Sequence, residues 1–238
     1  MSSKQNITAI ILAAGSSSRM GDTVDDKLLL SLADKPVIWY SVKAFSDARI
    51  VSQIVIVYRD NEQKNVIENS VREFGIPIFW AKGGKERQDS VWSGLETSPK
   101  DTEVVLIHDG ARPLITPNAV REVAEAAYNA GAACLARKVN DTIKKTDSKN
   151  SGDGGYQIET IDRSNLWAME TPQAFRYALI REAYQKVLHS NISMTDDLAA
   201  IETRGHLVQF VENDRPNIKL TTPLDVSYIE FLIKESQA

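Results

Sequence analysis

The first half of the chain alternates between short apolar runs and longer stretches whose apolar residues recur every three or four positions. The apolar runs, each bounded by turn-forming residues, predict buried strands, and the longer stretches predict helices. The predicted strands cover residues 7–14, 52–59, 76–84 and 103–113, and the predicted helices cover residues 36–48, 61–75, 87–97 and 116–131. Strands that alternate with helices form βαβ units. We therefore expect an α/β fold with a mostly parallel sheet.

The pattern changes after residue 138. Two strand-like runs, residues 139–146 and 156–163, flank a tip rich in glycine, serine and asparagine. They predict a β-hairpin over residues 139–163, which we expect to project because it has few large apolar residues. An isolated two-stranded ribbon is only marginally stable in water. We therefore expect this arm to pack against a second copy of the chain, in a homodimer.

Beyond the hairpin, the pattern predicts helices over residues 177–188, 195–205 and 226–235, and a strand over residues 206–213. The 238 residues show no internal repeat. Because this length suffices for one large α/β domain, we interpret residues 1–238 as one domain with the hairpin embedded in it.

Composition and charge narrow the class of protein. Hydrophobic residues make up 42% and charged residues 25% of the chain, as in an ordinary soluble globular protein. The formal net charge is −4, so we expect no nucleic-acid partner and no attraction to an anionic membrane. The single cysteine, Cys134, excludes an internal disulfide and a cysteine-based zinc site. No stretch approaches the ~20 apolar residues of a membrane span, and we expect a cytoplasmic protein.

In parallel sheets, ligands bind beside the carboxyl ends of the strands. The first predicted strand ends in "AAGSSSRMG", where Ala13, Ala14 and Gly15 begin a loop whose backbone N–H groups can converge on a phosphate. Arg19 and Lys27 add the positive charge that suits a polyphosphate. The alternative is a flexible loop with two solvated cations.

Three further stretches carry candidate chemistry. In "GGKERQDS", Gly83 and Gly84 would let the backbone approach a flat base, and Ser90 could form a hydrogen bond; the alternative is a glycine-rich helix start. In "HDGARP", Asp109 stands at a strand end, where a carboxylate can hold Mg²⁺ or cap a turn. Lys219 lies in the polar turn "NIKLTTPLD", where a lysine is most often simply solvated.

In this order, the motifs resemble those of the 2-C-methyl-D-erythritol 4-phosphate cytidylyltransferases of the non-mevalonate isoprenoid pathway. The resemblance covers nearly the whole chain. It rests on "AAGSSSRMG", Lys27, "GGKERQDSV", "HDGARP", "DTIKK", "DRSNLWAMETPQAF", "TDD" and "NIKLTTPLD". It implies a Rossmann-like nucleotidyltransferase domain in a homodimeric enzyme. Such an enzyme joins CTP to a sugar-alcohol phosphate with the help of Mg²⁺ and releases pyrophosphate.

The resemblance also implies a role for each matching residue. It implies catalytic roles for Arg19, Lys27, Arg163 and Lys219. Nucleotide binding falls on Ala13, Ala14, Gly15, Gly83, Gly84, Lys85 and Ser90. Binding of the methylerythritol phosphate falls on Asp109, Arg112, Thr142, Thr171 and Thr195, and Asp109 is also the expected metal ligand. The family's hairpin crosses to the other subunit, which would carry Thr142 and Arg163 toward the partner's site.

Two positions depart from the family pattern. Members commonly have Pro-Lys-Gln where this chain has "DDKLL", so Asp26 and the missing proline predict a more acidic, looser loop before Lys27. Lys85 stands where an aspartate often contacts the cytosine, so base recognition is expected to rely more on backbone groups. Two other functions remain open: a nucleotidyltransferase for ribitol phosphate or a molybdopterin cofactor, and a nucleotide sensor without catalysis.

Overall fold

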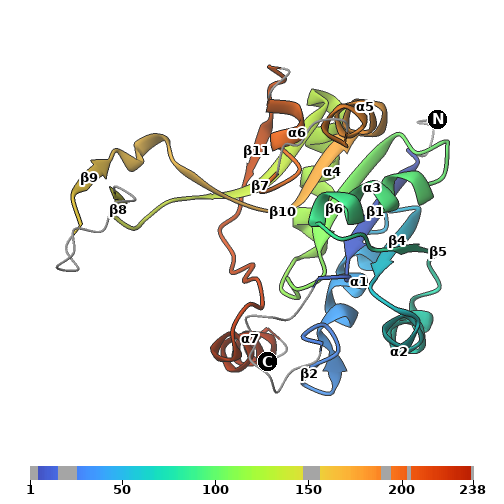
Figure 1. The fold of residues 1–238 in the computed structure, drawn as a ribbon. Helices are drawn as coiled ribbons and strands as arrows, with labels where there is room; N and C mark the ends of the chain where they lie inside the picture. Colours follow the sequence, from blue (N-terminus) through green and yellow to red (C-terminus); the bar gives the residue numbers. More distant parts are fainter. Residues whose placement is uncertain (1–4, 16–25, 147–155, 189–193, 203–204, 237–238) are drawn as a thin grey trace.

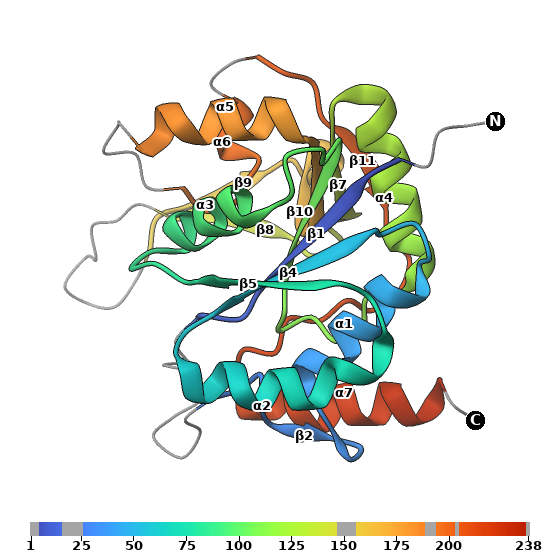
Figure 2. The same cartoon turned by 90° about the vertical axis from the view of Figure 1, so that its right-hand side faces the viewer.

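The computed structural model describes residues 5–15, 26–146, 156–188, 194–202 and 205–236. A seven-stranded sheet forms the centre, with the strand order β11-β7-β10-β6-β1-β4-β5, and helices cover both of its faces (Figures 1 and 2). The strands of this sheet are β1 (Ile7–Leu12), β4 (Gln53–Tyr58), β5 (Ile78–Lys82), β6 (Val104–Asp109), β7 (Ala132–Lys138), β10 (Trp167–Arg176) and β11 (Gln209–Glu212). The result is a three-layer α/β domain.

The sheet is mostly parallel, as the alternation of strands and helices predicts. β1 pairs in parallel with β4 and β6, β4 with β5, and β7 with β11. Only β10 runs against its two neighbours, β6 and β7, among the described strands of this sheet. The carboxyl ends of β1, β4, β5 and β6 therefore meet at one edge of the sheet.

Seven α-helices cover the sheet in the described part of the chain. They are α1 (Val37–Asp47), α2 (Asn61–Val71), α3 (Arg87–Thr97), α4 (Pro117–Ala130), α5 (Tyr177–Leu188), α6 (Ala199–Glu202) and α7 (Pro223–Glu235). Successive residues of β1 face opposite layers: Ile11 belongs to the core that α1, α2, α4 and α7 share, whereas Ile10 belongs to the core that α3, α5 and α6 share. Because both faces are covered, the strands are continuous apolar runs rather than alternating ones. No described helix is both long and apolar enough to cross a membrane.

The pattern of apolar residues does not predict β7 or β10. The middle of β10 holds the buried polar residues Glu170, Thr171 and Gln173, which interrupt the apolar run, and its pairing with β7 shifts between Met169 and Gln173. Glu170 accepts hydrogen bonds from the side-chain amides of Asn213 and Asn217, at 2.8 and 3.0 Å. Such distant partners make the buried polar strand stable, and the local sequence does not reveal them.

Two helix boundaries also differ from the prediction. The described α6 begins at Ala199 rather than at residue 195, because the Asp196 side chain accepts a hydrogen bond from the Ala199 amide at its start. α7 begins three residues before the predicted start, since Thr222 and Asp225 form a reciprocal capping box around its first turn.

The predicted hairpin is present as an arm that projects from the ends of β7 and β10 (Figure 1). Its strands are β8 (Ile143–Thr146) and β9 (Ile158–Ile161), which pair in an antiparallel ladder with Ile143 opposite Ile161. The predicted tip, residues 147–155, lies outside the described residues. Ile143, Tyr156 and Ile158 are exposed on the arm.

Candidate active site

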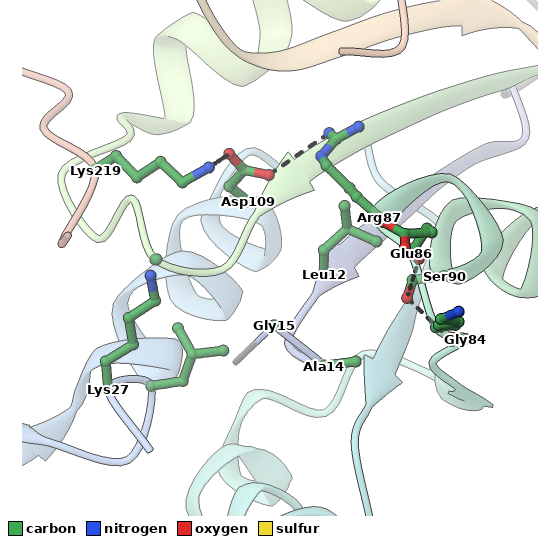
Figure 3. Close-up of a pocket in the computed structure, with 13 residues that line it drawn as sticks. Leu12, Ala14, Gly15, Lys27, Gly84, Glu86, Arg87, Ser90, Asp109 and Lys219 are labelled. Carbon is green, nitrogen blue, oxygen red and sulfur yellow. Dashed lines mark hydrogen bonds and ion pairs between the residues drawn. The ribbon is translucent and has the colours of Figure 1, made fainter. Parts of the chain in front are cut away.

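A pocket of about 380 Å³ opens at the carboxyl ends of the parallel strands (Figure 3). Its walls include eight residues that the sequence predicts for the site: Ala14, Gly15, Lys27, Gly84, Lys85, Ser90, Asp109 and Lys219. These residues come from four separate segments of the chain. The tertiary structure therefore brings together the loop after β1, the loop after β5, the end of β6 and the turn before α7.

Asp109 is the centre of a charged cluster in this pocket. The Asp109 carboxylate accepts a hydrogen bond from the ammonium of Lys219 at 2.6 Å, and its other oxygen lies 3.6 Å from the guanidinium of Arg87 (Figure 3). The Nε of Arg112 lies 4.0 Å from the same carboxylate. Burial raises the pKa of Asp109, but these three cations outweigh it and lower the pKa below its usual value. Asp109 is therefore ionised at neutral pH.

Arg87 is a pocket residue that sequence reasoning missed. It is the first residue of α3, and its two terminal nitrogens donate to the two carboxylate oxygens of Asp197 at 2.8 and 2.7 Å. Asp197 is fully buried and also accepts a hydrogen bond from the Tyr184 hydroxyl. Burial disfavours the charge of Arg87, but Asp197 and Asp109 raise its pKa above the usual value. A cation two residues after Lys85 was the available signal, but its buried partner is far away in the sequence.

The two glycines after β5 are needed for close packing. A Cβ at Gly83 would lie 2.2 Å from the Cβ of Ala14, and one at Gly84 would lie 2.2 Å from the Cβ of Asp89. The loop after β1 and the loop after β5 therefore touch directly through Gly83. Next to this contact, the two loops border the pocket through Ala14 and Gly84.

Ser90 holds this loop in place. Its hydroxyl oxygen accepts a hydrogen bond from the Gly84 amide at 3.1 Å and donates to the Glu86 carbonyl at 3.2 Å. The predicted hydrogen-bonding group is therefore present in the pocket wall and is already engaged with the backbone. Ala13 and Gly83 lie behind that wall, where their amides donate to the carbonyls of Val57 and Tyr58, both at 2.8 Å.

The expectation of a looser loop before Lys27 is wrong at Asp26. Asp26 is buried, and its carboxylate accepts hydrogen bonds from the Leu28 amide at 2.9 Å and the Gln63 side chain at 2.6 Å. Arg59 lies 3.2 Å from the same carboxylate. Lys27 thus follows an anchored residue, and its ammonium points toward the side of the pocket that Lys219 borders (Figure 3).

Other predicted residues lie away from the pocket wall. The guanidinium of Arg112 donates to the Asn217 carbonyl at 2.7 Å behind Asp109. Thr171 is buried, and its hydroxyl oxygen accepts from the Asp109 amide at 3.1 Å, so it supports the end of β6. Thr195 is exposed.

The arm carries two further predicted residues. Thr142 is exposed, and the guanidinium of Arg163 donates to the Asn140 carbonyl across the base of the hairpin. The arm points away from the sheet, so neither residue borders the pocket of its own chain (Figure 1). Arg19, predicted to bind the triphosphate, lies outside the described residues.

His108 lies directly behind the charged cluster. It is fully buried, 3.1 Å from the Thr171 hydroxyl through Nδ1 and 3.3 Å from the Arg112 carbonyl through Nε2. Burial lowers the pKa of His108 to about 4, so the ring is neutral at neutral pH. A neutral histidine in this position supports the backbone beside Asp109 and Arg112.

Comparison with known proteins finds cytidylyltransferases among the relatives of this chain. A relative from Caldanaerobacter subterraneus subsp. tengcongensis, named 2-C-methyl-D-erythritol 4-phosphate cytidylyltransferase, is 41% identical over 97% of this chain and 100% of its own. The chloroplastic relative from Oryza sativa subsp. japonica, with the same enzyme name, is 37% identical over 98% of this chain and 76% of its own.

Solved structures give the same result for the fold. The crystal structure of 4-diphosphocytidyl-2C-methyl-D-erythritol synthase from Anaerococcus prevotii superposes with a TM-score of 0.83 at 26% identity, covering 98% of this chain and 100% of that one. The enzyme from Thermus thermophilus superposes with a TM-score of 0.77 at 26% identity, covering 97% and 100%. Residues 7–235 also match the family as a whole, and the chain therefore belongs to the 2-C-methyl-D-erythritol 4-phosphate cytidylyltransferase (IspD) family.

Proposed function

We propose that the pocket at the carboxyl ends of β1, β5 and β6 transfers the cytidylyl group of CTP to 2-C-methyl-D-erythritol 4-phosphate. The products are 4-diphosphocytidyl-2-C-methyl-D-erythritol and pyrophosphate. The observation that carries this proposal is the convergence of Lys27, Arg87 and Lys219 on one pocket beside Asp109. Several cations around a single carboxylate suit two anionic substrates that must approach each other.

The chemistry follows from charge. An oxygen of the methylerythritol phosphate attacks the α-phosphorus of CTP, the bond from that phosphorus to the bridging oxygen breaks, and pyrophosphate leaves with the electron pair. No covalent intermediate with the protein is needed. The chain has to align the two phosphates and neutralise the charge that moves onto the leaving group.

The pocket residues divide this work. Lys27 stabilises the charge that develops on the triphosphate, together with Arg19 of the same loop. Lys219 holds the attacking phosphate once that phosphate competes with Asp109 for its ammonium, which now lies 2.6 Å from the carboxylate. The backbone around Gly84 and the side chain of Lys85 lie where the base would be read.

Asp109 fits a role as the protein's ligand for Mg²⁺. Its carboxylate is ionised and borders the pocket, and among the described residues no group of three histidine, cysteine or acidic side chains could form a metal site by itself. Mg²⁺ is commonly held by one or two carboxylates together with substrate phosphates. When bound, it would supply positive charge to the phosphate oxygens and orient them.

The arm supports a homodimer with shared active sites. Its exposed apolar side chains, Ile143, Tyr156 and Ile158, would be covered if two arms packed together. Thr142 and Arg163 would then reach the pocket of the partner, where Arg163 would bind the methylerythritol phosphate through its two parallel donors. Residues 139–163 would thus be a dimerisation arm embedded in one nucleotidyltransferase domain. A cytoplasmic location stays a prediction from the sequence.

A pyrophosphate-release assay tests the proposed function. The purified chain with CTP, Mg²⁺ and 2-C-methyl-D-erythritol 4-phosphate should release pyrophosphate, and Lys27→Ala, Arg19→Ala and Lys219→Ala should each lower kcat by about 100-fold. Circular dichroism should show a wild-type fold for each variant. Faster turnover with ribitol 5-phosphate would overturn the proposed substrate, and CTP binding without turnover would leave a nucleotide sensor.

A further inference from the structure

One side-chain amide joins the two ends of the loop that carries the predicted phosphate-binding residues. The Nε2 of Gln63 donates to the carbonyl of Ala13 at 2.9 Å and to the carboxylate of Asp26 at 2.6 Å. Ala13 directly follows β1, and Asp26 directly precedes Lys27. Gln63 lies on α2, so a third segment of the chain sets the separation of the other two.

The Gln63 side chain is itself held firmly. It is 1% exposed, and its carbonyl oxygen accepts a hydrogen bond from the Arg59 amide at 2.7 Å. Its backbone amide donates to the side chain of Asp60, which caps the start of α2. Each polar atom of the Gln63 side chain therefore has a partner, and the amide has one orientation that satisfies all of them.

Asp26 has the complementary set of contacts. One oxygen accepts from the Leu28 amide and the other from Gln63 and Arg59, so within the described residues this buried carboxylate faces donors on both oxygens. Leu28 is buried in the core beside α1, and its carbonyl accepts a hydrogen bond from the Ile38 amide at 3.1 Å. Lys27 is therefore flanked by a polar anchor on one side and an apolar anchor on the other.

We infer that Asp26 and Gln63 are positioning residues, which act on the reaction through Lys27 by fixing where its backbone enters the pocket. The inference rests on the role proposed above for Lys27. Neither side chain borders the pocket, so neither contacts a substrate there. A displacement of about 1 Å in a catalytic group can lower a rate by about 100-fold. The pair in this chain would replace the conformational restriction that a proline before the lysine would supply.

Asp26→Asn and Gln63→Glu each break the contact without changing the size of a side chain. In Asp26→Asn the new amide nitrogen faces a donor in either orientation, because one oxygen of Asp26 accepts from Leu28 and the other from Gln63 and Arg59. In Gln63→Glu the new carboxylate faces the Asp26 carboxylate and the Ala13 carbonyl. Each variant should lower kcat for pyrophosphate release by at least about 10-fold, with a smaller effect on KM. The exchanged pair, Asp26→Asn with Gln63→Glu, restores a donor opposite an acceptor and should recover part of the loss.

A double-mutant cycle with Lys27→Ala separates positioning from a structural defect. If Asp26 acts through Lys27, Asp26→Asn should have no further effect on kcat when Lys27 is already alanine. The control is Asp47→Asn, the same change in an exposed ion pair with Lys43 on α1, which should leave kcat and the melting temperature unchanged.

The outcomes distinguish the two claims. An equal fall in kcat in the presence and absence of the Lys27 side chain would overturn the positioning role, and so would wild-type kcat in both single variants. If the single variants fail to fold, the exchanged pair replaces them in the same test. Its effect on kcat is then measured with and without Lys27→Ala, and an equal effect in both cases also overturns the inference. A wild-type chain that releases no pyrophosphate would instead overturn the proposed function, and the inference with it.

Discussion

Arg87 and Asp197 lie 110 positions apart in the sequence, yet they form a two-pronged ion pair with N–O distances of 2.8 and 2.7 Å. The pair joins the first residue of α3, beside the loop after β5 that borders the pocket, to the turn that carries Thr195. Asp197 has no exposed surface, and its backbone amide donates to the side chain of Gln173 on β10 at 3.0 Å. Asp197 thus connects the pocket through its carboxylate, and β10 and α6 through its backbone amide and carbonyl.

Removing this carboxylate should destabilise the protein strongly. Asp197→Ala leaves the Arg87 guanidinium without its main partner, and losing a hydrogen-bonded charged group costs about 1.5–3 kcal/mol. The loss is smaller than for a fully buried pair, because the Arg87 side chain is 30% exposed and keeps Asp109 nearby. Urea denaturation would measure the change in the free energy of unfolding. The matched control is Glu96→Ala, which removes an exposed partner of Arg181 at 2.7 Å and should cost less than about 1 kcal/mol. Equal losses in the two variants would contradict the role of the buried pair.

The pKa of His108 predicts a loss of stability in mild acid. The pKa is about 4 in the folded protein against 6.5 for a free histidine, because burial disfavours the charged ring. The unfolded chain therefore binds a proton that the folded one does not. The contribution of neutral His108 to the free energy of unfolding is complete above pH 6.5 and is lost as the pH falls from there toward 4. The loss is about 2 kcal/mol between pH 7 and pH 5.

Urea denaturation of His108→Gln between pH 7 and pH 5 would check this sign and size. The variant should lose most of this pH dependence, whatever its stability at pH 7. His206→Gln, at an exposed position, is the control for the substitution itself. A variant of His108 with the full wild-type slope would show that another group causes the loss.

Gly83 should not tolerate a side chain. The Cβ of an alanine would lie 2.2 Å from the Cβ of Ala14, so the loops after β1 and β5 would have to separate. We expect Gly83→Ala to cost about 1–3 kcal/mol of stability and to weaken CTP binding in calorimetry. Gly15→Ala is the control for stability, because no described atom lies within 4 Å of the Cβ it would add. A stable Gly83→Ala with wild-type CTP affinity would contradict this contact.

CTP should be the preferred nucleotide. The loop of Gly84 and Lys85 borders the pocket, and the close packing of Gly84 against Asp89 fixes its backbone where the base would be read. We expect kcat/KM for CTP to exceed that for UTP, ATP and GTP by at least about tenfold, or about 1.4 kcal/mol. Pyrophosphate release with each nucleotide would measure it. Equal rates with UTP would contradict base recognition by this loop, and Lys85 would then be the first residue to vary.

Two inactive variants should complement each other if active sites are shared. In a mixed dimer of Lys27→Ala and Arg163→Ala chains, one site carries both changes and the other carries neither. Random association places half of the dimers in this class, so about a quarter of the wild-type activity should return for independent sites. Co-expression with two affinity tags would isolate the mixed dimers. Activity at the level of the parents in isolated mixed dimers would place Arg163 in the site of its own chain.

The sequence by itself determined the layers of the fold and the segments of the site. Continuous apolar runs such as residues 7–14 identified strands that are covered on both faces, and their alternation with helices led to a mostly parallel sheet. The rule that ligands bind at the carboxyl ends of such strands then selected the loops around Gly15, Gly84 and Asp109. The fold inference succeeds because periodicity is a local property, and the loops selected at the strand ends line one pocket.

Only the tertiary structure decided the features that depend on distant partners. β10 escapes prediction because Glu170 is stabilised in the core by Asn213 and Asn217, which follow it by more than forty residues. From the sequence, Asp26 predicts a more acidic, looser loop before Lys27, but folding buries it against Gln63 and Arg59. The sequence shows Arg87 only as a cation near Lys85, and folding gives it Asp197 as its partner. A buried polar group is stable only where its partners converge, and the chain's path through three dimensions decides that convergence.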